Sequence, residues 1–459
     1  MALDPETCRR ARLARDRRFD GCFFIAVRTT NIYCRPICPA PSPKEENITY
    51  FPSAAGAAEA GYRPCLRCRP EASPGTPAWV GTCTTVSRAL RLIAESALDD
   101  SGVDTLADKL GVGSRHLRRL FVEHLGAPPV AVAQTRRLHF AKKLIDETEL
   151  SFTDIAMASG FGSVRRFNTV FQNLYGRTPT ELRRLIRTRP DTDKGSYRFR
   201  LLYRPPFDWE AILGFLQARA IPGVESVADG AYRRSIDLGG VPGRIEVRHA
   251  NDALQLRIEF PDPKALFLIV ERVRRIFDLA ADPFPIEQQL RADPLLAARL
   301  ERRPGLRVPG AWDEFELSVR AVLGQQISVK AASTLAGRIA QRFGSPFGDD
   351  VVFPTREALA NAPIEECGVI GKRAETIRAL ARADRAGPIP GIGPWTTEYI
   401  AMRASGNPDA FPAGDLILQR AASCKTAREL ENRAETWRPW RAYAAIHLWQ
   451  GVKDDSGIH

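Results

Sequence analysis

The sequence has no long apolar run. No segment reaches the roughly 18 consecutive apolar residues of a membrane-spanning helix, so we expect no membrane partner. The stretch Met1–Cys22 also lacks the apolar core of a secretory signal, so we expect a cytoplasmic protein. Cysteine is sparse too, and the isolated thiols fit a reducing compartment better than a disulfide framework. These isolated cysteines are Cys8, Cys22, Cys83, Cys367 and Cys424.

The length and the charge distribution indicate several folded parts with a polyanionic partner. A chain of 459 residues is too long for one compact domain, and its 44% hydrophobic content can form real cores. Residues 1–190 hold 29 Lys and Arg against 19 Asp and Glu, so most of the net charge of +12 lies there. This asymmetry favours a nucleic-acid partner for that part, although a solvated basic face would have the same composition.

The other four cysteines form two short pairs. Cys34 and Cys38 make a C-x3-C pair, and Cys65 and Cys68 make a C-x2-C pair. Each spacing lets two thiolates bind one ion from a single turn, and two such turns complete the tetrahedral set that structural Zn2+ prefers. We therefore expect one zinc ion. A pair of disulfides and four unrelated thiols are the alternatives that the spacing leaves open.

The segments around these cysteines carry a family resemblance. Residues 20–38 predict a strand, a turn and a second strand, and Gly61-Tyr-Arg-Pro-Cys65 introduces the second pair. Across residues 1–71 the chain closely resembles the methyl-accepting domain of Ada-type alkylation-response proteins, so we expect a small zinc-bound α/β domain over 1–74. The resemblance implies that Cys34 is both ligand and nucleophile, taking a methyl group from a DNA methylphosphotriester. It places Thr30, Arg63 and Arg67 near that phosphate.

An electrostatic switch would follow from such a transfer. Four thiolates around a divalent cation leave a net charge of about −2, which repels DNA phosphates, and methylation of one sulfur removes one negative charge. The alternative is a zinc site that only stabilises a small domain.

Two similar segments follow, at residues 105–121 and 151–171. Each predicts a helix, a glycine-containing turn and a second helix, with Ser114 and Ser163 as the expected caps of the second helices. The pair resembles the module of AraC-type regulators, so we expect an all-α paired helix-turn-helix domain over 81–189. On the connecting helix near 134–147, Lys142 and Lys143 are expected to reach only phosphate or solvent. The expected base-reading side chains are Arg115, His116, Arg118, Arg119, Arg165, Arg166 and Asn168.

The remaining sequence predicts two further domains. Alternating runs at 197–203, 232–238, 244–249 and 253–260 indicate an α+β domain with an antiparallel sheet over 196–300. The last third is helical, and Ile389-Pro-Gly391-Ile-Gly393-Pro-Trp395 predicts two helices joined by a hairpin. Gly391 and Gly393 would let backbone N–H groups approach a DNA phosphate.

Followed by Phe411-Pro-Ala-Gly-Asp415, this hairpin resembles the helix-hairpin-helix DNA glycosylases of the AlkA type, over residues 197–451. We therefore expect an all-α glycosylase domain over 301–459. The resemblance gives Asp415 the catalytic role, stabilising positive charge on the deoxyribose. Asp415 could also simply cap the helix 416–422. The resemblance also implies a base pocket of Phe215, Trp395, Tyr399 and Trp449, and it places Gln326 where an apolar wedge enters the base stack. Aromatic rings of this kind are more often core residues.

Several family features are missing. Trp395 stands where lyase-type relatives have a Schiff-base lysine, and no carboxyl-terminal cysteine cluster for an iron–sulfur group is present. The Pro-Cys-His-Arg motif with which Ada-type proteins repair methylated guanine is absent as well. A monofunctional glycosylase is implied. The segment 382–389 is shorter than the family pattern, so the hairpin support is expected to be reduced.

The combined expectation is a multidomain protein that repairs alkylated DNA and responds to it. Its partners would be damaged and promoter double-stranded DNA and RNA polymerase, and it would work in the cytoplasm at the nucleoid. One rival interpretation is a methylation-sensing transcription regulator whose glycosylase-like domain is inactive and only holds DNA. Another is a zinc-stabilised glycosylase without a sensor.

Overall fold

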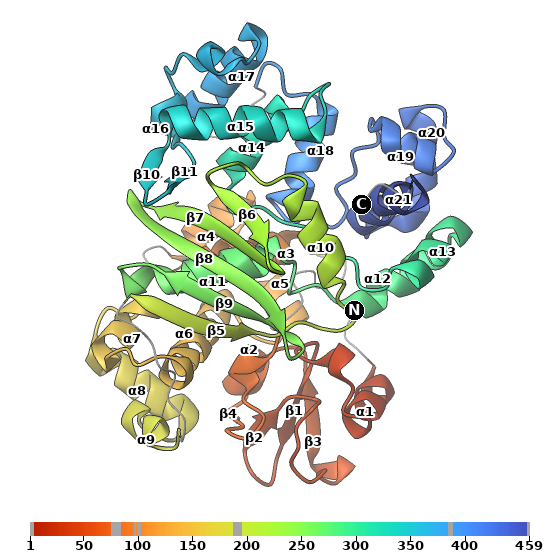
Figure 1. Cartoon of the computed structure of the whole chain (residues 1–459). Coiled ribbons are helices and arrows are strands. Elements are labelled where there is room, and N and C mark those ends of the chain that lie inside the picture. Colours follow the sequence, from red (N-terminus) through yellow and green to blue (C-terminus); the bar gives the residue numbers. More distant parts are fainter. Residues whose placement is uncertain are drawn as a thin grey trace. The chain divides into compact units, whose positions relative to one another are not determined.

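The computed structural model describes residues 4–74, 84–95, 98, 102–186, 195–383 and 389–456 (Figure 1). The chain divides into two compact units. The first comprises Met1–Pro205, Asp262–Glu271 and Leu279–Asp282, and the second comprises Pro206–Pro261, Arg272–Asp278 and Pro283–His459. Among the described residues, none of the helices combines the length and the apolarity that a membrane crossing requires.

The first unit begins with a small sheet between two helices. Its strand order is β3-β1-β2-β4, with β1 antiparallel to β2 and β3, and β4 parallel to β2. Ile25 and Val27 of β1 share a buried cluster with α1, whereas Phe24 and Ala26 of the same strand pack with α2. The alternation of side chains along a strand thus buries both faces of the sheet. The elements are α1 (Pro5–Leu13), β1 (Phe24–Val27), β2 (Ile32–Cys34), β3 (Ile48–Phe51), α2 (Ala54–Glu59) and β4 (Arg63–Pro64).

Seven helices complete most of the first unit, and they confirm the paired helix-turn-helix pattern. Apolar residues of α3, α4, α5 and α6 form one core, in which Leu106, Leu117 and Phe121 are completely buried. The helices are α3 (Thr84–Ala94), α4 (Val103–Leu110), α5 (Ser114–Leu125), α6 (Pro129–Glu147), α7 (Phe152–Ala158), α8 (Val164–Tyr175) and α9 (Pro179–Arg184). Strand β5 (Ser196–Leu201) follows them.

The sheet end of the first unit, residues 4–74 with the strands β1 to β4, packs directly against the helices α5 and α6. The phenol oxygen of the fully buried Tyr33 lies 3.0 Å from His139 Nε2 on α6, and Arg69 forms an ion pair with Asp146 of the same helix. Ser53 donates a hydrogen bond to the carbonyl of Leu125, at the end of α5. Metal-ligand segments and helix-turn-helix segments therefore belong to one packed body.

The expectation for Lys142 and Lys143 is wrong. Both are buried, with Lys142 Nζ 2.6 Å from Asp146 and Lys143 Nζ 2.9 Å from Glu147. Lys142 also approaches Glu71, which comes from the sheet end of the same unit. Buried ammonium groups need partners, and these carboxylates supply them. The two lysines hold the first unit together and do not face DNA.

The second unit contains an antiparallel meander with short turns. β6 (Glu225–Ala228), β7 (Ala231–Leu238), β8 (Val241–Ala250) and β9 (Ala253–Glu259) pair in sequence order. Asp229 and Gly230 join β6 to β7 with φ of 54° and 67°. Two positive φ angles in succession make the tight turn whose twist matches a hairpin.

The predicted hairpin joins two of the helices of the second unit. α17 (Gly371–Arg382) and α18 (Pro394–Arg403) both pack on α14 (Glu314–Leu323). A short hairpin of β10 (Ser345–Phe347) and β11 (Asp350–Val352) adds two strands that the sequence analysis does not predict. The remaining helices are α10 (Trp209–Gln217), α11 (Leu266–Ile276, shared with the first unit), α12 (Pro283–Leu290), α13 (Pro294–Arg302), α15 (Val329–Phe343), α16 (Arg356–Leu359), α19 (Leu416–Ala421), α20 (Ala427–Ala434) and α21 (Arg441–Ser456).

Candidate functional sites

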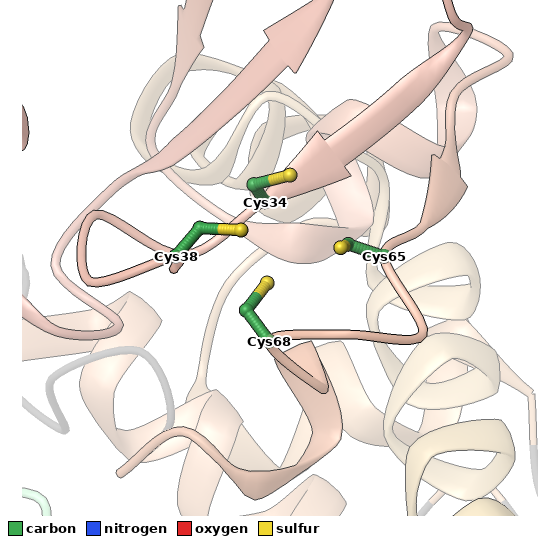
Figure 2. Close-up of side chains that lie close together, drawn as sticks. All are labelled: Cys34, Cys38, Cys65 and Cys68. Carbon is green, nitrogen blue, oxygen red and sulfur yellow. The ribbon is translucent and has the colours of Figure 1, made fainter. Parts of the chain in front are cut away.

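Four sulfur atoms meet in the first unit. The Sγ atoms of Cys34, Cys38, Cys65 and Cys68 all lie within 4.8 Å of one another, and Figure 2 shows them pointing toward a common centre. Sulfurs bound to one tetrahedral Zn2+ at about 2.3 Å would be about 3.8 Å apart, so the set fits that ion. Hydrogen bonding among the thiols raises the pKa of Cys34 and Cys68. Four thiolates this close together repel one another, and a bound divalent cation would offset that repulsion.

The four sulfurs differ in the donors that they receive. Backbone N–H groups donate to Cys38 from Ala40, to Cys65 from Cys68, and to Cys68 from Arg35. Within the described ranges no backbone N–H donates to Cys34, which is partly exposed at the end of β2, whereas Cys65 and Cys68 are buried. An N–H···S bond stabilises negative charge on sulfur and lowers its nucleophilicity. This difference agrees with the predicted nucleophilic role of Cys34, which stays a prediction.

A buried ion pair fixes the turn that carries the first ligand pair. Arg35 and Asp20 are 5% and 4% exposed, and Arg35 Nε lies 2.8 Å from Asp20 Oδ1. The Arg35 guanidinium also donates to the Cys68 carbonyl at 3.0 Å, so one side chain joins the two ligand-bearing turns. The predicted phosphate contacts Thr30, Arg63 and Arg67 are all exposed in the same sheet part of the first unit.

The predicted base-reading side chains lie on two exposed helix faces. Arg115, His116, Arg118 and Arg119 are exposed on α5, as are Arg165, Arg166 and Asn168 on α8. Ser163 caps α8, because its hydroxyl accepts from the N–H of Arg166 at 3.2 Å. The cap predicted at Ser114 is wrong. α5 begins at Ser114 itself, Gly113 takes the capping position, and no side-chain cap forms.

The predicted hairpin lies between α17 and α18. Gly391 has φ of +91°, and its carbonyl accepts from Gln325 Nε2 at 2.9 Å. A Cβ atom at Gly391 would collide with Thr376 of α17, whose hydroxyl donates to the Pro390 carbonyl at 3.1 Å. Gly393 caps α18 and has open space around it. The shortened segment lies largely outside the described residues, but Gln325 and Thr376 support the hairpin from the other side.

Gly391→Ala is expected to lower stability by about 1–3 kcal/mol, because both the positive φ and the close Thr376 penalise a side chain. Gly393→Ala, the matched control, should keep the stability of the wild type, since its φ is −91° and no atom lies within 4 Å. Urea denaturation measures the first effect. Equal stability of the two variants would contradict it. Both variants should bind undamaged duplex DNA more weakly.

The carboxylate of Asp415 receives four donors. It caps α19, with Oδ1 accepting from the N–H groups of Ile417 at 2.9 Å and Leu418 at 3.0 Å. Trp449 Nε1 donates to the same oxygen at 3.2 Å, while Trp395 Nε1 donates to Oδ2 at 3.1 Å. These donors orient the carboxylate and stabilise its negative charge. Because Oδ2 has a single donor, it keeps a lone pair for a reacting group.

The predicted pocket rings come together beside this carboxylate. The rings of Trp395 and Tyr399 stack with centroids 5.1 Å apart and an interplanar angle of 9°, and Trp449 meets Tyr399 edge-on at 6.4 Å. All three are only partly buried, unlike ordinary core rings. Phe215 joins them through Arg403, whose guanidinium lies 4.9 Å from the Phe215 ring and 5.4 Å from the Tyr399 ring. Gln326, the predicted wedge, is exposed with φ of +55°.

The sequence analysis missed the arginines next to these rings. Arg219 lies 3.8 Å from the centre of the Phe215 ring, and Arg403 donates to the phenol oxygen of Tyr399 at 2.8 Å. Both arginines stand four residues after the ring that they contact. Arg403 shares α18 with Tyr399, whereas Arg219 lies just after the end of α10. That spacing is a signal in the sequence, but it is common on any Arg-rich helix.

Comparisons with known families match each part of the chain. Four family models match: the metal binding domain of Ada over residues 7–71, a helix-turn-helix domain over 106–185, the AlkA N-terminal domain over 198–313, and the HhH-GPD superfamily base excision DNA repair protein over 319–439. With the cysteine cluster, the first match confirms the predicted Zn2+ site. The matches also confirm the expected multidomain fold class and DNA as a partner.

Known proteins resemble the chain over different lengths. A Mycobacterium tuberculosis protein described as a probable bifunctional transcriptional activator/DNA repair enzyme AlkA is 43% identical over 480 residues, covering 98% of this chain and 97% of that protein. DNA-3-methyladenine glycosylase 2 of Escherichia coli is 35% identical over 278 residues, covering 55% of this chain and 96% of its own. In fold, a 3-methyladenine DNA-glycosylase from Archaeoglobus fulgidus matches with a TM-score of 0.50, 24% identity, and coverage of 55% of this chain and 96% of that chain.

Proposed function

The chain belongs to the family of bifunctional transcriptional activator/DNA repair enzymes, and on that premise we propose that it excises alkylated bases with Asp415 and senses DNA methylation with Cys34. The observation that carries the first activity is the carboxylate of Asp415, held by the indole N–H groups of Trp395 and Trp449 beside the ring of Tyr399. The second activity is supported by the cysteine cluster with its one sulfur that lacks a backbone donor. We further propose domains over 1–74, 81–189, 196–300 and 301–459.

In base excision, Asp415 would stabilise charge on the sugar. Breaking the bond between deoxyribose C1′ and the base nitrogen develops positive charge on the sugar, and a fixed carboxylate lowers the energy of that state. The electron pair of the broken bond leaves with the base, which is a good leaving group because alkylation has made it cationic. A water molecule near Oδ2 then supplies the hydroxyl group at C1′ and loses a proton. The product is an abasic site, since no lysine replaces Trp395 to form a Schiff base.

The test is excision from a duplex that contains one 3-methyladenine or 7-methylguanine. Free base and an alkali-labile abasic strand are the expected products. The rival interpretation, an inactive domain that only holds DNA, predicts binding without either product. Hence a wild-type protein that binds the duplex but releases no base overturns the enzymatic part of the proposal.

In methyl transfer, Cys34 would act once. Bound zinc keeps the cluster thiolates deprotonated at neutral pH. Cys34 Sγ attacks the methyl carbon of a methylphosphotriester, so that an S–C bond forms, the C–O bond breaks, and the phosphodiester leaves as an anion. The thioether that results carries no charge, and the cluster becomes less negative by one unit. A less negative surface repels DNA phosphates less, so the methylated protein should bind DNA more tightly.

Intact-mass spectrometry tests this transfer with an oligonucleotide that bears one methylphosphotriester. Wild type is expected to gain one methyl group, and peptide mapping should place it on Cys34. Cys34→Ser should gain none, because a serine hydroxyl is not ionised near neutral pH. Cys424→Ser, which changes a partly exposed cysteine outside the cluster, is the matched control and should behave like wild type. Methylation at a residue other than Cys34, or none in wild type, favours a zinc site that only stabilises the fold.

Regulation would follow from the tighter binding. The exposed arginines of α5 and α8 would read promoter bases in the major groove, and the bound protein would recruit RNA polymerase. Such a protein acts in the cytoplasm, at the nucleoid. The packing of the zinc sheet against α6 supports a direct path from Cys34 to these helices, because Tyr33 precedes Cys34 and contacts His139.

A further inference from the structure

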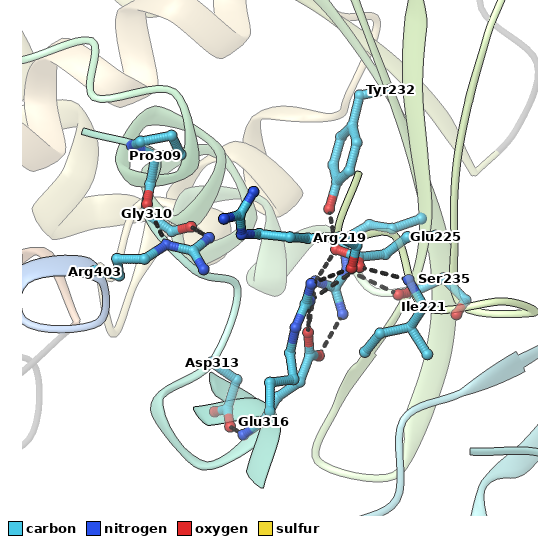
Figure 3. Close-up of polar contacts among 12 residues, drawn as sticks. Arg219, Ile221, Glu225, Tyr232, Ser235, Pro309, Gly310, Asp313, Glu316 and Arg403 are labelled. Carbon is cyan, nitrogen blue, oxygen red and sulfur yellow. Dashed lines mark hydrogen bonds and ion pairs between the residues drawn. The ribbon is translucent and has the colours of Figure 1, made fainter. Parts of the chain in front are cut away.

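Arg403 is a buried cation that lies against the rings of Phe215 and Tyr399. Its side chain is 3% exposed, and it donates to the carbonyls of Pro309 at 2.8 Å and Gly310 at 3.0 Å (Figure 3). Its Nη1 donates to the phenol oxygen of Tyr399 at 2.8 Å. The two carbonyls fix the plane of the guanidinium, so Nη1 is aimed at the phenol.

Arg403 has no carboxylate partner among the described residues, and neither has Arg219. The neighbouring arginines do have them: Arg234 pairs with Glu316 at 2.6 Å, and Arg320 pairs with Glu225 at 2.9 Å. Within each of these two pairs the positive and the negative charge cancel. The cluster around the phenol therefore contains four guanidinium groups and two carboxylates, the latter being Glu225 and Glu316.

The phenol of Tyr399 faces both unbalanced cations, Arg403 and Arg219. Burial by itself raises the pKa of the phenol, but the charges of Arg403, Arg219 and Arg320 outweigh it, and the pKa falls to about 8. These cations come from α18, from the segment after α10, and from α14. On the side of α19 and α21, the charged group is Asp415, separated from the phenol ring by Trp395 and Trp449. A buried charge without a partner is costly, and ionisation of Tyr399 would reduce that cost.

We propose that Arg403 and Arg219 make Tyr399 the specificity-determining residue for lesion charge, because they allow its side chain to meet a cationic alkylated base as a tyrosinate. This inference rests on the proposed excision activity. A cationic base that stacks against the rings of Trp395 and Tyr399 meets two uncompensated guanidinium groups, which repel it. The tyrosinate supplies the missing negative charge at the ring that stacks on Trp395, where a cation–π contact is also available.

The sign of the pH dependence follows from the phenol. Below its pKa the phenol is neutral, and the pocket keeps its two excess positive charges. Above its pKa the tyrosinate forms, so excision of a cationic base should rise with pH. Excision of a neutral lesion such as hypoxanthine gains nothing from the tyrosinate. The effect of Tyr399 on that reaction should therefore not change with pH.

An absorbance titration tests the ionisation without any catalysis. The near-ultraviolet tyrosinate signal of wild type minus that of Tyr399→Phe should titrate with a midpoint near pH 8. Burial raises the pKa of Tyr33, Tyr175 and Tyr232, so these phenols stay protonated there. Arg403→Gln should move the midpoint upward toward the ordinary tyrosine value of about 10. If that variant does not fold, Arg219→Gln should move it in the same direction. A wild-type midpoint near 10 overturns the proposal.

A kinetic ratio tests the selection. The ratio of kcat/KM for wild type to that for Tyr399→Phe cancels the ionisation of the substrate and of Asp415. For 7-methylguanine it should rise about eightfold between about pH 7 and pH 8.5, as expected for a group with a pKa of about 8. For hypoxanthine it should change less than about twofold over the same range. Equal pH dependence for both lesions overturns the charge selection. If wild type excised neither lesion, the proposed function would be refuted instead. The absorbance midpoint would still report on the ionisation of Tyr399.

Discussion

Asp415→Asn is expected to lower excision of 3-methyladenine by at least about 100- to 1000-fold, the range seen when one preorganised electrostatic group is lost. The substitution removes the negative charge that faces the sugar but keeps an oxygen of the same shape. Asn is as good an N-cap as Asp, so the hydrogen bonds from the N–H groups of Ile417 and Leu418 to the side chain at position 415 should persist. Single-turnover release of the base measures the loss, and thermal melting should show an unchanged stability.

The matched control for this prediction is Asp313→Asn. Asp313 caps α14 in the same way, with Oδ1 accepting from the N–H of Glu316 at 3.0 Å. Unlike Asp415, it accepts no hydrogen bond from Trp395 or Trp449. The control should keep both stability and excision. An Asp415→Asn protein that excises the base at a rate close to that of wild type would show that the carboxylate only caps the helix. Reduced melting of Asp415→Asn would mean that its loss of activity has a structural cause.

Removal of zinc is expected to unfold the sheet end of the first unit. The apparent free energy of zinc binding by such sites is about 10–16 kcal/mol at neutral pH, and much of it is folding free energy. Removal of the ion takes away the positive charge that balances the thiolates. Hydrogen bonding among the thiols then raises the pKa values of Cys34 and Cys68. Hydrogen exchange of β1 and β2 should accelerate after chelation, and methyl transfer should stop.

Excision should survive the same treatment. Asp415 and its aromatic neighbours belong to the second unit, whereas all four cysteines belong to the first. A protein that is treated with a chelator should therefore still release 3-methyladenine. Cys68→Ala, assayed with added zinc, provides the genetic counterpart. If chelation left β1 and β2 protected from exchange, the cluster would not be a structural metal site.

Local motifs could be predicted from the sequence because they depend on neighbouring residues. Short cysteine spacings predict the metal site, and alternating runs predict β7, β8 and β9 within a few residues. The dual role of Asp415 as helix cap and pocket carboxylate also agrees with the structure, although its part in catalysis stays a prediction.

Features that depend on distant partners could not be predicted. Lys142 and Lys143 look like solvated cations in sequence, but both also contact distant segments. Lys142 approaches Glu71, and Lys143 donates to the carbonyl of Arg200. Ser114 resembles a cap as strongly as Ser163 does, and the start of the helix, set by packing of α4 and α5, decides between them. The partners of Arg403 include the carbonyls of Pro309 and Gly310, which lie far away in the sequence, so its lack of a carboxylate partner among the described residues could not be predicted.

The path of the chain between the two compact units limits how such a protein can be rearranged. The chain changes unit five times, after residues 205, 261, 271, 278 and 282. No single cut therefore separates the two units cleanly. A repair fragment that starts at residue 206 would still carry two short pieces of the regulatory body, stripped of their neighbours. A truncation for expression that begins at residue 206 would therefore require the pieces 262–271 and 279–282 to fold without the rest of the first unit.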